Sequence, residues 1–71
     1  MFDLRSNLVS NALELFREAV ERGVVHDDPT GADAHLHKVY VDLQGPNMMT
    51  NGEIARFSAF LVSRLDDVCR T

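Results

Sequence analysis

With 71 residues, the chain has room for one domain (residues 1–71), whose core is at the lower size limit for stability. Eleven acidic residues against seven lysines and arginines give a net charge of −4, which argues against nucleic acid and favours a protein partner with a basic surface. The lone cysteine, Cys69, excludes a disulfide within the chain and favours the reducing cytoplasm. No apolar run approaches the roughly 18 residues of a membrane span, so we expect no membrane segment.

Residues 4–22 carry the clearest helical pattern. At 100° per residue, their apolar side chains fall within one arc of roughly 160°. Asp3 is a suitable N-cap, and Gly23 suits the left-handed position that ends many helices. Because such an arc is wider than one neighbouring helix requires, we expect this helix to pack against two neighbours.

The middle of the chain predicts a β-hairpin. The sequence "DPTG" at residues 28–31 suits a type I turn between a short strand at residues 24–26 and a long strand at residues 34–43. In the long segment, one side of the expected strand carries His35, His37, Val39, Val41 and Leu43. Since a two-stranded ribbon leaves a long free edge, we expect that edge to pair with its copy in a second chain.

A second helix is expected over residues 51–70. The sequence "TNGE" at residues 50–53 has the spacing of a capping box. The expected core stripe of this helix is Ile54, Phe57, Leu61, Leu65 and Val68. The sequence therefore predicts an α+β fold in the order helix, hairpin, helix, as a homodimer with strands paired across the two chains. The expected dimer interface contains Val39, Val41, Leu43, Leu13, Phe16 and Val20.

The histidines of residues 26–37 raise the question of a metal site. His35 and His37 would share one face of the strand, and His26 would join them in only one hairpin register. The alternative interpretation is a turn that leads into a strand, with aspartates in their ordinary turn positions. We favour the turn and expect neither metal nor cofactor, because no more specific ligand motif is present. If this expectation is wrong, the ligands are His26, His35 and His37.

Catalysis and DNA binding have little support in the sequence. There is no glycine-rich phosphate loop and no nucleophile elbow, and Cys69 lies at the end of a helix where the dipole disfavours a thiolate. A strand before a capped helix resembles, in plan only, the ribbon-helix-helix DNA binders. Here a long helix precedes the strand, and the outward strand face offers one cation, Lys38. We expect no enzymatic activity, and a DNA-binding β-ribbon remains an alternative.

Two features of the expected helices suggest a protein partner. Glu14, Glu18 and Glu21 form an acidic ridge on the first helix, where like charges repel each other. Phe60 lies off the apolar stripe of the second helix, in a polar surround. It is either covered by the first helix or a second subunit, or it is the exposed anchor of an interface. The residues around it are Arg56, Arg64 and Asp67.

These observations favour a small acidic cytoplasmic module that binds another protein and modulates it. An inhibitor or anti-activator of a nucleic-acid-binding regulator, of the kind found among phage-type accessory proteins, fits the size and charge. A histidine-rich metal-binding protein is the further alternative.

Overall fold

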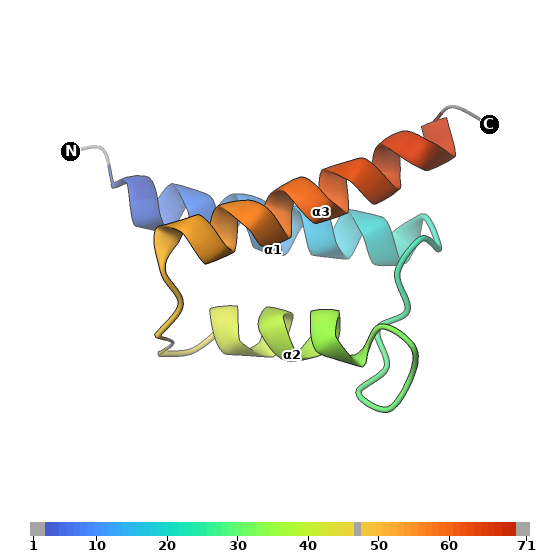
Figure 1. Cartoon of the computed structure of the whole chain (residues 1–71), viewed down its shortest axis with the longest axis horizontal. Helices are drawn as coiled ribbons and strands as arrows, with labels where there is room; N and C mark the ends of the chain where they lie inside the picture. Colours follow the sequence, from blue (N-terminus) through green and yellow to red (C-terminus); the bar gives the residue numbers. More distant parts are fainter. Residues whose placement is uncertain (1–2, 47, 70–71) are drawn as a thin grey trace.

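The computed structural model describes residues 3–46 and 48–69, with the side chains of residues 68 and 69 left out. It contains three helices: α1 (Leu4–Glu21), α2 (Ala34–Leu43) and α3 (Asn51–Cys69). α1 and α3 lie side by side and run in the same direction, whereas α2 lies below them and runs in the opposite direction (Figure 1). No strand occurs in the described ranges, so the fold is all-α and the predicted α+β class is wrong.

α1 begins and ends as its sequence predicted. Asp3 caps its start, because the Ser6 amide donates to one carboxylate oxygen of Asp3 at 3.3 Å and the Ser6 hydroxyl donates to the other at 2.7 Å. At its end, Gly23 has a φ of 76° and donates to the Val20 carbonyl at 3.0 Å. The Val24 amide then reaches back to the Ala19 carbonyl, also at 3.0 Å, which completes a Schellman motif.

α2 occupies residues 34–43, the segment in which alternating side chains predicted the long strand. Its inward residues are Leu36, Val39, Tyr40 and Leu43, whose spacing of three, four and seven positions places them on one side of a helix. Leu36 and Leu43 are buried, and the other two pack against the core. The strand prediction was wrong because it grouped two histidines with the valines on one buried face. In the structure, His35 is exposed and His37 is half-buried.

The expected short strand at residues 24–26 is a loop, and it carries Val25 into the core. The turn at residues 28–31 is present, since the Gly31 amide donates to the Asp28 carbonyl at 3.3 Å. This turn leads into a helix instead of a second strand. The hairpin interpretation therefore placed the turn correctly and mistook the elements on both sides of it.

α3 starts with the predicted capping box. The Glu53 amide donates to the Thr50 hydroxyl, and the Thr50 amide donates to the Glu53 carboxylate, both at 3.1 Å. Ile54, Phe57 and Leu61 of the predicted stripe are buried. Leu65 is half-buried against the core, and the side chain of Val68 lies outside the described part.

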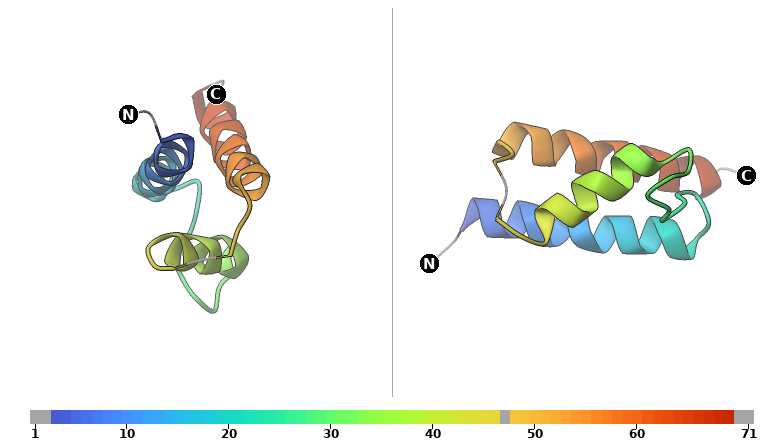
Figure 2. Two further views of the ribbon diagram at one scale, coloured as in Figure 1. Left: turned by 90° about the vertical axis from the view of Figure 1, so that its left-hand side faces the viewer. Right: turned by 90° about the horizontal axis from the view of Figure 1, so that it is seen from below.

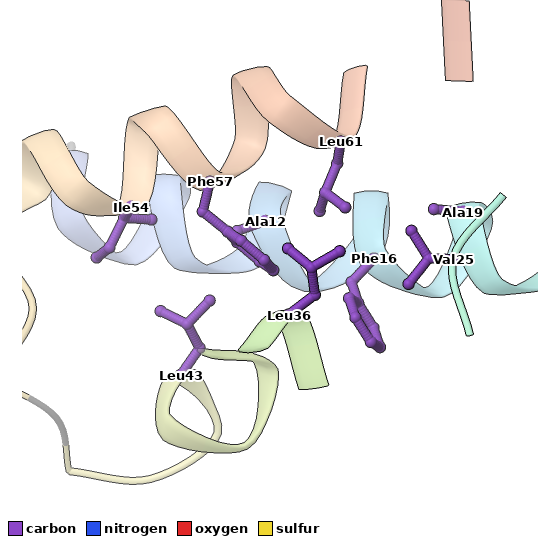
Figure 3. Packing of buried hydrophobic residues seen from close by; sticks show 9 residues of the cluster. All are labelled: Ala12, Phe16, Ala19, Val25, Leu36, Leu43, Ile54, Phe57 and Leu61. Carbon is purple, nitrogen blue, oxygen red and sulfur yellow. The ribbon is translucent and has the colours of Figure 1, made fainter. Parts of the chain in front are cut away.

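The three helices meet around Phe16 (Figure 3). Its ring stacks on Tyr40 of α2 with centroids 4.3 Å apart, and it lies 6.3 Å from the ring of Phe57 of α3. α1 thus packs against two neighbours, as its wide apolar arc predicted, and its contact with α3 is the more extensive. The buried apolar residues are Ala12, Phe16, Ala19, Val25, Leu36, Leu43, Ile54, Phe57 and Leu61.

The strand-paired homodimer is also wrong, because the described ranges offer no strand to pair. Of its expected interface, Phe16 and Leu43 are buried within the single chain. Val41 is 49% exposed on α2, because the helix turns it away from the side that carries Leu36 and Leu43. The remaining members are half-buried and pack against the core: Leu13, Val20 and Val39.

Candidate interaction surfaces

Asp33 ties the loop between α1 and α2 to α3. Its carboxylate is buried and accepts a hydrogen bond from the His26 amide at 2.9 Å, and the Arg64 guanidinium lies 3.3 Å from its other oxygen. Arg64 also donates to the Val24 carbonyl at 2.9 Å. The hydrogen bond from His26 and, after it, the positive charge of Arg64 hold the pKa of Asp33 below its ordinary value. Together these bonds tie the half-buried Arg64 side chain of α3 to the loop between α1 and α2.

Phe60 lies beside this fixed arginine. The guanidinium carbon of Arg64 is 5.0 Å from the centre of the Phe60 ring, which is the geometry of a cation–π contact. The phenyl side chain nevertheless remains 41% exposed in the single chain. Arg56 and Asp67, the other predicted members of this surface, are exposed on the same helix. The structure thus favours an exposed Phe60 over one covered by α1, and it brings Phe60 and Arg64 into contact.

The acidic ridge of α1 is a separate surface. Glu14, Glu18 and Glu21 are all exposed, on the side of α1 opposite to its buried residues. Glu18 forms an ion pair with Arg22 at 3.1 Å, which offsets part of the charge of the ridge. At the border with α3, Glu18 lines a hollow with Val62, Leu65 and Asp66, and Phe60 is not part of that hollow.

The histidines do not converge. His35 and His37 are two positions apart on a helix, which separates their directions by about 200° instead of placing them on one face. The Nδ1 atom of His37 lies 2.6 Å from a carboxylate oxygen of Asp27. His26 contacts Asp33 through its backbone amide and not through its imidazole ring. Among the described residues, no three histidine, cysteine, aspartate or glutamate side chains are placed to hold a metal ion.

Of the shallow hollows on the surface, two lie on α2 and between α1 and α3. One, of about 480 Å³, is on the outer side of α2 and is lined by Pro29, Ala34, His35, His37, Lys38, Val41 and Asp42. The second, of about 270 Å³, lies between α1 and α3 and is lined by Leu15, Glu18, Arg22, Val62, Leu65 and Asp66. Both hollows are open to solvent.

The sequence did not single out two of these features. Asp33 was interpreted as a turn residue, and only its burial under Arg64 reveals it as an anchor. The exposure of Val62 was also missed, although its position beside the stripe of α3 was a usable signal.

No described helix combines the length and the apolar character needed to cross a lipid bilayer. No protein family model, curated protein or solved structure matches this chain.

Proposed function

We propose that the chain is a small protein-interaction module, which binds and modulates another protein through the exposed side of α3 around Phe60 and performs no catalysis. The observation that carries this proposal is that Phe60, a residue 41% exposed, lies against the guanidinium of Arg64, which is itself hydrogen-bonded to the loop between α1 and α2. Aromatic and arginine side chains contribute most of the affinity in protein interfaces, typically from a few central positions with a polar rim.

The fixed geometry of Arg64 lowers the cost of binding. A long arginine side chain ordinarily loses conformational freedom when it enters an interface, at about 0.5–1.5 kcal/mol. Here the Val24 carbonyl and the Asp33 carboxylate already hold it, and the guanidinium in turn orients the Phe60 ring. Arg56 and Asp67 provide the charged rim that would select among partners.

The charge of the chain indicates the kind of partner. A net charge of −4 and the exposed acidic ridge of α1 would accelerate the approach of a protein with a basic surface. We therefore propose as partner a basic protein such as a nucleic-acid-binding regulator, which this module inhibits or restrains. The single cysteine supports a cytoplasmic setting.

A photo-crosslinking experiment tests this function. Phe60 is replaced by p-benzoylphenylalanine in cells that produce the chain, and the control variant carries the same group at Val41, which is 49% exposed on α2. We expect a discrete crosslinked protein from position 60 and none from position 41. With the identified partner purified, Phe60→Ala should weaken binding about 30-fold, which corresponds to about 2 kcal/mol, in calorimetric titrations.

Stability measurements separate binding from folding. Because Phe60 is partly exposed, Phe60→Ala should leave the thermal unfolding midpoint almost unchanged. Equal crosslinking from both positions, or undiminished affinity of Phe60→Ala for the captured protein, would remove the Phe60 surface from the proposal.

A further inference from the structure

The side of α1 and α3 that is turned away from α2 carries a row of apolar residues. Both helices lie above α2, and no other described element covers them from the opposite side (Figure 2, left). Leu4 is 53% exposed and Val62 is 50% exposed. Single exposed apolar residues are ordinary, but a row along two adjacent helices is a mark of an interaction surface. We call this surface the α1/α3 face; its residues are Leu4, Leu8, Asn11, Leu15, Val62 and Leu65. Leu8, Leu15 and Leu65 are half-buried against the core, and the charged residues Glu18, Arg22 and Asp66 border the face at its C-terminal end.

The contribution of α1 to this face has the spacing of a coiled-coil seam. Leu4, Leu8, Asn11 and Leu15 follow one another at intervals of four, three and four residues. At 100° per residue, the three leucines lie within about 40° of one another around the helix. Asn11 is exposed in the middle of this row.

The two ends of the α1/α3 pair differ in charge. Because α1 and α3 run in the same direction, both helix N-termini lie at one end and both C-termini at the other (Figure 1). The helix dipoles make the end with the two N-termini positive and the end with the two C-termini negative. In the sequence, the C-terminal halves of the two helices with the one residue that follows each carry five acids against four arginines: Glu14, Glu18, Glu21, Asp66 and Asp67 against Arg17, Arg22, Arg64 and Arg70. At the N-terminal end, Asp3 and Glu53 are balanced by Arg5 and Arg56.

We propose that the α1/α3 face binds a second copy of this chain, with α1 antiparallel to its counterpart. An antiparallel arrangement places the positive end of each pair against the acidic end of the other, whereas a parallel one would bring like ends together. It also brings Leu4 opposite Leu15 of the partner subunit and Leu8 opposite Asn11 of the partner subunit, as the spacing of the seam requires.

This dimer does not rest on the proposed function. Phe60 and Val62 are two positions apart on α3, so their side chains differ in direction by about 200°. The Phe60 surface therefore stays open when the α1/α3 face is covered. The dimer also differs from the one expected from the sequence, because it uses none of the residues now buried around Phe16.

Sedimentation equilibrium tests the dimer on the full chain. At concentrations of tens of micromolar, we expect a mass twice the chain mass of 8.0 kDa. Val62→Glu and Leu4→Glu should each weaken the dimer at least about tenfold, because each places a charge in the covered seam. Val41→Glu is the matched control, since Val41 is equally exposed but lies on α2. Circular dichroism confirms that each variant remains helical.

Cysteine crosslinking tests the orientation. In a Cys69→Ser background, chains with Leu4→Cys are mixed with chains that carry Leu15→Cys and are then oxidised. We expect mixed disulfide dimers to exceed the dimers formed by either variant alone. A predominance of Leu4→Cys homodimers would overturn the antiparallel arrangement. A wild-type monomer at about 200 µM, which is about 200-fold above a Kd of 1 µM, would overturn the dimer itself, as would folded Val62→Glu and Leu4→Glu variants that dimerise like the wild type.

Discussion

Asp33 is the residue on which the path of the chain between α1 and α2 depends. Its carboxylate accepts from a backbone amide of the loop and faces an arginine of α3, while its own backbone carbonyl accepts from the amides of Leu36 and His37 in the first turn of α2. The loop, α2 and α3 are thus joined at one buried group. Because the hydrogen bond and the positive charge both favour the ionised form, the folded state holds this group as a carboxylate.

This arrangement predicts how stability depends on pH. Since folding lowers the pKa of Asp33, its contribution is complete above the unfolded carboxyl pKa of about 4 and is lost as the pH falls through the lower folded value. In urea unfolding at several pH values from 7 down to 2, Asp33→Asn should be less stable than the wild type at pH 7 and should lose less stability on acidification.

Other carboxyls with lowered pKa values keep part of the acid dependence in this variant: Asp3, Asp28 and Glu53. Asp42→Asn, at an exposed position on α2, serves as the control. An Asp33→Asn variant with the same acid profile as the wild type would show that the carboxylate charge is not what anchors the loop.

At the scale of the elements, the ends of α1 and α3 were predictable because capping is local. Asp3, Gly23 and the Thr50–Glu53 pair act on amides and carbonyls within a few residues of themselves, so the sequence alone identifies them. α2 was not predictable in the same way. It has ten residues, two valines that suit a strand and no side-chain hydrogen bond at its N-cap, so its helical state depends on burial against α1.

The C-terminal motif of α1 gives a prediction at this scale. Gly23→Ala should lower the free energy of unfolding by about 1–2 kcal/mol, because alanine is strained at a φ of 76°. No heavy atom lies near the position of the added methyl group, so the lost stability comes from backbone strain and not from a steric clash. Gly45→Ala, which has the same open space without a positive φ, should change stability much less in the same denaturant titration. Equal losses in the two variants would contradict this account.

For the whole molecule, stability is concentrated where the three helices meet. Phe16 is buried among residues from α2 and α3, so Phe16→Ala should cost about 3–5 kcal/mol, a large part of the stability of a domain this small. The matched variant Phe60→Ala removes the same ring from an exposed position and should cost far less. Chemical unfolding measures the free energy of unfolding of both variants. Similar losses in the two would contradict the central role of Phe16.

The difference between buried and exposed positions also explains how much of the candidate site the sequence could predict. The angle of Phe60 on its helix marked it as separate from the core stripe, but its exposure depended on the course of α2, which the sequence pattern misplaced. Leu8 and Leu15 were recognised as apolar, yet the arc of α1 did not reveal which of its sides α2 and α3 would cover. In both cases, exposure depends on where helices distant in the sequence pack, and no local sequence pattern encodes that packing.

The parallel pairing of α1 with α3 has a consequence for the synthesis of the chain. The partner that covers most of α1 lies beyond residues 22–50, which a ribosome takes a few seconds to add at about 5–20 residues per second. A helix can form within microseconds, so α1 has time to sample its helical state long before α3 is available to cover it. Until then only α2 is available to shield the Phe16 side of the nascent chain. The core therefore closes only after α3 has been synthesised, and the apolar surface of α1 is open to chaperones during that interval.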